Sequence, residues 1–188
     1  MPVTALDERT ALVVIDIQRS VIGLATFTPT AGVVDRCSRL ARAFRQTGQP
    51  VVLVNVELRP EIMLAPRVDN KPPPRTFTPD FAKLADELEA DPARDIFITK
   101  RQWGAFYGTE LDLQLRRRKV TGIVMCGIAT SIGVESTARD AFERGYNLTF
   151  ASDAMTDLFE DAHQNALNLI FPRIGEIGTT AEILAKLA

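Results

Sequence analysis

The stretch ALVVIDI, residues 11–17, decides the fold, because Leu12 to Ile15 form an unbroken apolar run that ends in an acid. A second run of the same kind, VVLVNV, occupies residues 51–56. A strand with one face in water alternates apolar and polar residues, whereas continuous runs are typical of parallel strands covered by helices on both faces. The two stretches therefore predict a buried parallel sheet.

The rest of the chain repeats this unit of strand followed by helix. Further strands are predicted over residues 95–99, 122–126 and 147–151, with a weaker one over 176–178. Helices are predicted over about 33–47, 81–88, 109–118, 132–144, 160–171 and from 179 onward, the third opened by a capping box of Thr109 and Asp112. Such alternation predicts one α/β domain over residues 1–188 with a mostly parallel sheet.

Composition excludes several classes of protein. The chain of 188 residues carries 22 basic and 24 acidic residues, so no global positive charge favours nucleic acid. Its longest apolar run is far shorter than the roughly 20 residues that cross a bilayer. Cys37 and Cys126 form no disulfide framework, and the first ten residues do not resemble a signal peptide. We therefore expect a cytoplasmic protein with no nucleic-acid or membrane partner.

The connection over residues 57–79 is long and rich in proline. It is interpreted either as a stiff surface linker, as a lid over the site, or as an arm that packs on a second subunit. Arg59, Arg67 and Arg75 would give a lid the means to hold a carboxylate. Large apolar residues along the segment favour burial, since contiguous apolar patches are unusual on soluble monomers.

Polar residues at the carboxyl ends of the strands mark the candidate site, because open parallel sheets bind ligands at that edge. Asp16 ends the first strand, Lys100 follows the third, and the turn from Gly127 to Thr130 opens a helix and directs backbone N–H groups to one place. Taken singly, Asp16 is more often a helix cap or a salt-bridge partner, and most lysines are simply solvated.

Three segments carry a family resemblance: LVVIDIQ (12–18), ITKRQWGAFYGTELDLQLR (98–116) and VTGIVMCGIATSIGVESTARDAFERGYNLTFASDA (120–154). In content, order and spacing the chain resembles the isochorismatase-like hydrolases, also called cysteine hydrolases. The resemblance implies a three-layer fold with a six-stranded sheet of order 3-2-1-4-5-6. It also implies a homodimer or homotetramer and a cis peptide bond between Ile128 and Ala129.

The family's catalytic residues are an Asp, a Lys and a nucleophilic Cys. Asp16 and Lys100 match the first two, but Gly133 stands where the Cys is expected. Glycine cannot form the acyl-enzyme of the family's amidases. Ser131 and Ser136 are displaced from that position along the helix, and both cysteines are predicted to pack in the core.

Other residues have expected roles around this centre. Substrate contacts are expected from Gln18, Trp103, Phe106, Ile128, Ala129 and Thr130, although core packing is an equal alternative for the two aromatic residues. His163 is expected in a surface or capping role, and the run Arg116 to Lys119 as a solvated helix end. The chain has a single histidine, and the segment directly after the second strand, residues 55–59, contains none, so we predict no catalytic metal and no cofactor.

Isochorismatases resemble this chain in carrying glycine at the nucleophile position. They hydrolyse a vinyl ether without a covalent intermediate, so the first hypothesis is a cofactor-free hydrolase of a small carboxylated substrate. Asp16 would be the acid, and Lys100 would orient it and hold an anionic substrate. Two alternatives stay open: a binding protein that has lost catalysis, and an amidase that uses water directly, either natural or as a nucleophile knockout.

Overall fold

The computed structural model describes residues 3–58, 61, 66–70, 78 and 80–187. Most of the connection over 57–79 therefore lies outside the described residues, and with it the expectations for Arg59 and Arg75. Val68, which is described, is 48% exposed.

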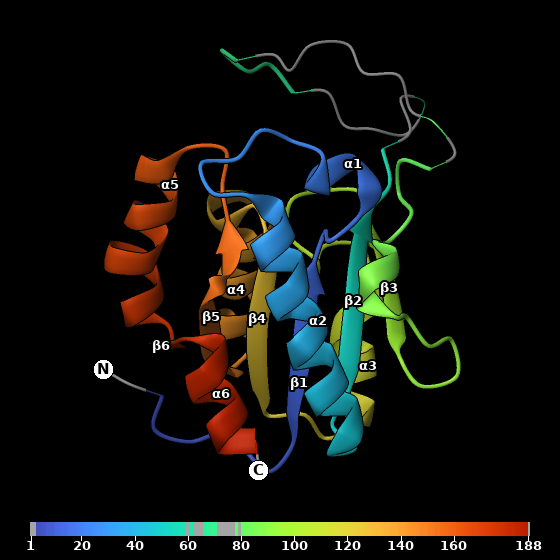
Figure 1. The fold of residues 1–188 in the computed structure, drawn as a ribbon, viewed down its shortest axis with the longest axis vertical. Helices are drawn as coiled ribbons and strands as arrows, with labels where there is room; N and C mark the ends of the chain where they lie inside the picture. Colours follow the sequence, from blue (N-terminus) through green and yellow to red (C-terminus); the bar gives the residue numbers. More distant parts are fainter. Residues whose placement is uncertain (1–2, 59–60, 62–65, 71–77, 79, 188) are drawn as a thin grey trace.

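Six parallel strands form one sheet in the order β3-β2-β1-β4-β5-β6 (Figure 1). The strands are β1 (Thr10–Ile15), β2 (Val51–Val56), β3 (Ile96–Lys100), β4 (Gly122–Ile128), β5 (Asn147–Thr156) and β6 (Glu176–Gly178). The predicted strand order is confirmed. The pair β1 and β4 lies at the centre, where the order reverses, so ligands are expected at its carboxyl end.

Helices cover both faces of this sheet, which confirms the three-layer arrangement (Figure 1). The helices are α1 (Arg19–Ile22), α2 (Thr30–Gln46), α3 (Leu111–Arg117), α4 (Glu135–Glu143), α5 (Glu160–Asn165) and α6 (Thr180–Leu187). Short π-helical or 3₁₀ turns add η1 (Asp86–Leu88), η2 (Thr130–Val134), η3 (Ala166–Ile170) and η4 (Phe171–Arg173). Within the described residues, no helix combines the length and apolar character needed to span a membrane.

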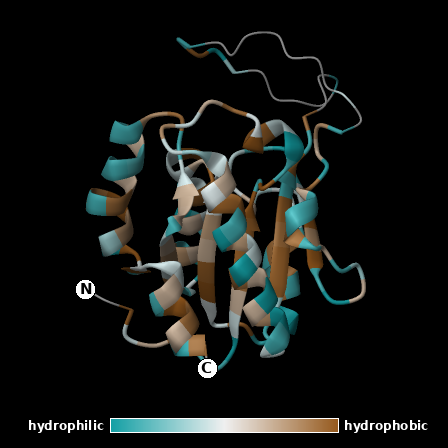
Figure 2. Cartoon of the chain, viewed as in Figure 1, coloured by the Kyte–Doolittle hydropathy of each residue, from teal (hydrophilic) through white to brown (hydrophobic). Residues whose placement is uncertain are grey.

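The central place of β1 in the sheet explains why its residues 11–15 are all apolar. Val13 and Ile15 belong to the core cluster that contains residues of α3 and α4, whereas Leu12 and Val14 belong to the cluster beneath α2. Successive side chains of a strand point to opposite faces, so burial on both faces requires a continuous run. Figure 2 shows the same division, with hydrophobic strands inside and hydrophilic outer helix faces.

Three predicted helices differ from those observed. The 81–88 segment is helical only in η1, because Lys83 and Ala85 form backbone hydrogen bonds with residues 17–19. The 160–171 helix divides into α5, η3 and η4. Thr109 accepts a hydrogen bond from the Leu111 amide, while Asp112 accepts one from Tyr146, so the predicted capping box does not form.

Candidate active site

Two buried side chains of opposite charge meet at the carboxyl edge of the sheet. Asp16 directly follows β1, and Lys100 is the last residue of β3, two strands away. The Lys100 Nζ atom lies 2.7 Å from Asp16 Oδ2, and the two side chains are 3% and 8% exposed. The predicted convergence of these residues is confirmed. Parallel strands bring it about because their carboxyl ends share one edge.

Gly133, in η2, forms the third corner of this site. A Cβ atom on Gly133 would lie 3.2 Å from Asp16 Oδ2 and 3.5 Å from Lys100 Nζ. It would also lie 2.9 Å from the Cγ2 atom of Ile15, closer than real Cβ contacts allow. The β-branched Ile15 has little rotamer freedom with which to move away. The position thus borders both charged groups and is fitted to glycine.

Burial dominates the electrostatics of Asp16. Loss of water raises the pKa of its carboxyl from 3.8 to about 6, and this effect exceeds the opposing charge of Lys100 and its hydrogen bond. The Oδ1 atom is buried and accepts no hydrogen bond from the described residues. One oxygen of the carboxyl is therefore fixed by Lys100, while the other is free to carry a proton.

Lys100 uses its whole ammonium group to hold this arrangement. Besides Asp16, its Nζ donates to the carbonyl oxygens of Trp103 at 3.0 Å and Gln102 at 3.3 Å. An ammonium has three N–H groups, so all of them are engaged. Lys100 positions Asp16, and it has no donor left for a substrate in this state.

The turn after β4 closes the site. Gly127 has φ +122°, and a Cβ atom there would overlap the carbonyl oxygen of Ile15, so only glycine fits. The Ile128–Ala129 peptide bond is cis, as the resemblance predicted. The Ile128 side chain is buried in the core, whereas Ala129 is partly exposed.

Two polar residues whose role at this turn the sequence did not predict support it. His163 is buried, its Nδ1 atom lies 2.8 Å from the Thr130 hydroxyl, and burial lowers its pKa. The surface role expected for His163 is therefore wrong. Asp157 accepts the Ser131 N–H at 2.6 Å. An acid at the end of a strand was a usable signal for Asp157, but β5 was predicted to end at residue 151.

Two of the expected substrate contacts, Gln18 and Phe106, have other surroundings. The Gln18 amide donates to the carbonyls of Val56 and Phe81 and accepts the Val56 N–H, so it joins backbone segments at the end of β1. Phe106 is buried in the core beside Tyr146. Trp103 is the most exposed of the six expected contacts, at 64%.

The structure also shows the surroundings of both cysteines and of the candidate metal ligands. Cys37 and Cys126 are fully buried in the cluster beneath α2, as expected. Among the residues that the structure describes, no group of three or more His, Cys, Asp or Glu side chains could hold a metal ion. Glu57, after β2, forms an ion pair with Arg101 at 3.0 Å.

Comparison with known proteins identifies the family of this chain. The isochorismatase domain model matches residues 10–182. An uncharacterized isochorismatase family protein, YecD of Escherichia coli O157:H7, is 46% identical over 95% of this chain and 96% of its own.

Relatives with a solved structure or a named activity extend the comparison. The structure of an isochorismatase family protein from Burkholderia thailandensis superposes with a TM-score of 0.94 at 42% identity, covering 100% of this chain and 98% of that one. The ureidoacrylate amidohydrolase RutB of Methylobacterium radiotolerans is 32% identical over 94% of this chain and 79% of its own. With its parallel sheet of matching order and the match over nearly its whole length, the chain belongs to the isochorismatase family of hydrolases.

Proposed function

We propose that this protein is a cofactor-free hydrolase that cleaves the vinyl ether of a small carboxylated substrate, with Asp16 as the acid. The observation that carries the proposal is the state of Asp16. Its pKa is raised to about 6, its Oδ2 atom borders the Cβ position of Gly133, and its Oδ1 atom is buried and accepts no hydrogen bond from the described residues. A general acid is most effective when its pKa lies near the working pH, and few carboxyls meet that condition.

The chemistry requires no covalent intermediate. Asp16 donates its proton to the terminal carbon of the enol ether, and the former double bond becomes an oxocarbenium ion. Water adds to this cation and returns a proton to the Asp16 carboxylate. The resulting hemiketal breaks its C–O bond and releases a ketone and an alcohol. Lys100 holds Asp16 in place and its charge stabilises the carboxylate that remains.

Hydrolysis of an amide is the second candidate. It is favoured by the likeness to RutB, which is named as a ureidoacrylate amidohydrolase. Asp16, ionised at neutral pH, would then act as the base for an attacking water, because Gly133 offers no thiol. The two candidates need opposite protonation states of Asp16, so their activities should change in opposite directions with pH.

Incubation with isochorismate and with a panel of amides that includes ureidoacrylate separates these candidates. Pyruvate release supports vinyl-ether hydrolysis, and ammonia release supports the amidase. Asp16→Asn should abolish either activity. Asp35→Asn, a change of an exposed acid on α2, serves as the matched control and should retain it. Absence of both products from folded protein contradicts both candidates and favours a binding protein.

A further inference from the structure

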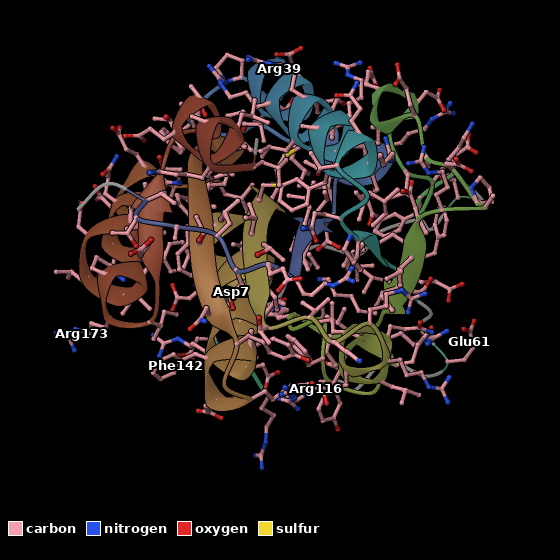
Figure 3. The ribbon with its side chains drawn as sticks, turned by 90° about the horizontal axis from the view of Figure 1, so that it is seen from below. Asp7, Arg39, Glu61, Arg116, Phe142 and Arg173 are labelled. Carbon is pink, nitrogen blue, oxygen red and sulfur yellow. The ribbon has the colours of Figure 1, made fainter. Side chains whose placement is uncertain are left out.

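A second concave site lies at the opposite edge of the sheet from Asp16. It is a cavity of about 530 Å³ whose lining includes Arg9, Pro50, Asp95 and Lys119. Arg9, Pro50 and Asp95 directly precede β1, β2 and β3, and Lys119 lies shortly before β4. Figure 3 looks onto this edge from below, with Arg116 of α3 labelled beside it. A strand of six residues separates the two edges by roughly 20 Å, so this cavity is not part of the hydrolytic site.

The lining of the cavity is strongly cationic. It contains the basic residues Arg9, Arg45, Arg94, Arg117, Arg118 and Lys119, and Asp95 is the only acid among the described residues that line it. Arg45 already neutralises Asp95 through hydrogen bonds of 2.9 and 2.7 Å, and the Asp95 side chain is only 1% exposed. The open part of the cavity is therefore positive, although the whole chain has a net charge of −2. Cations gathered in a concave site repel one another and focus a field that attracts anions.

A position at a helix terminus explains only some of these basic residues. Arg94 donates to the Arg45 carbonyl and Arg118 to that of Gln114, as basic residues at helix ends commonly do. Among the described residues, the side chains of Arg9, Arg117 and Lys119 form neither an ion pair nor a hydrogen bond. Arg9 belongs to no helix, so no helix dipole explains its place.

An unpartnered acceptor lies in the same lining. The Gln49 side chain donates through Nε2 to the Glu8 carbonyl at 2.8 Å. Its Oε1 atom is buried and accepts no hydrogen bond from the described residues. A buried carbonyl oxygen without a donor is destabilising, so a rotation of the Gln49 amide that lets a ligand hydroxyl or amino group donate to Oε1 would be favourable.

We propose that this cavity binds a small phosphate-bearing metabolite, such as a sugar phosphate or a nucleotide. Arg9, Arg117 and Lys119 would contact the phosphate, and a hydroxyl or amino group of the ligand would donate to Gln49 Oε1. The cavity volume falls within the usual range of small-molecule sites, about 300–1,000 Å³. A concave site of this size fits a compact ligand better than it fits a nucleic-acid backbone, which tracks along an extended groove.

Titration calorimetry with inorganic phosphate, ribose 5-phosphate, adenosine monophosphate and a 20-nucleotide RNA tests the proposal. The variant Arg9→Gln/Arg117→Gln/Lys119→Gln should bind the phosphate compounds at least tenfold more weakly than the natural chain. A matched control, Arg39→Gln/Arg173→Gln/Lys186→Gln, removes the same charge from exposed residues outside the lining and should bind normally. Circular dichroism verifies that both variants are folded.

Gln49→Met tests the proposed contact between Gln49 and the hydroxyl or amino group of the ligand. This change should weaken the binding of ribose 5-phosphate and adenosine monophosphate more than the binding of inorganic phosphate, which has no sugar or base. Absence of binding, or equal weakening by the control variant, overturns the proposal. Binding of the RNA alone also overturns it, because that result would show a general electrostatic surface.

Discussion

Protonation of Asp16 should make the stability of this protein depend on pH in an unusual direction. Burial raises the pKa of this carboxyl in the folded state to about 6, against 3.8 in the unfolded chain. The folded state therefore holds the proton more tightly. The stabilising contribution of Asp16 is complete below pH 3.8 and is lost as the pH rises through 6. At about 1.4 kcal/mol per pKa unit, the difference is about 3 kcal/mol.

Urea denaturation at pH 4, 5, 6 and 7 measures this contribution when the change in unfolding free energy with pH is compared between the natural chain and a variant. The Asn side chain of Asp16→Asn does not titrate, so the change in unfolding free energy between pH 4 and pH 7 should differ from that of the natural chain by about 2 kcal/mol. The full difference is not reached at pH 4 because the unfolded-state carboxyl is already more than half ionised there. Groups such as His163 titrate in both proteins and cancel. Asp35→Asn should keep the natural dependence on pH. If Asp16→Asn also keeps it, Asp16 is ionised throughout this range and the proposed acid role fails.

Three further results are expected. If Asp16 is the acid, kcat/KM for a vinyl ether should fall about tenfold per pH unit above pH 6, and a rate that rises there instead contradicts this role. Gly133→Ala should lower the unfolding free energy by about 1–3 kcal/mol in urea denaturation, because its Cβ meets Ile15, whereas an unchanged value would mean that the site has room for a side chain. Light scattering should give two or four times the chain mass of 20.7 kDa, and a mass equal to one chain refutes the predicted oligomer.

The sequence predicted the parts of this protein that depend on local pattern. Runs such as Leu12 to Ile15 indicate strands buried on both faces, and the burial of β1 between two helix layers agrees. Asp16 and Lys100 could be paired from sequence because topology alone brings the ends of parallel strands to one edge. The family resemblance identified Gly133 as the nucleophile position and predicted the strand order.

Other residues depend on partners that lie far away in the chain. Gln18 has the position of a site residue, but its amide is used by Val56 and Phe81, 38 and 63 residues further on. His163 carries no local sign of burial, because its contact with Thr130 forms only when α5 packs on the turn after β4. Residues 81–88 have helical spacing, yet backbone pairing with the end of β1 replaces most of that helix.

The fully occupied ammonium of Lys100 has a consequence for redesign of this enzyme. A group whose three N–H bonds are all committed to its own chain cannot select among substrates by direct contact. Selectivity must then be encoded by residues that the reaction itself does not use. An engineer can vary the rim of the site, beginning with the exposed Trp103, and can leave the charged pair untouched. Chemistry and substrate choice are separable properties in this protein.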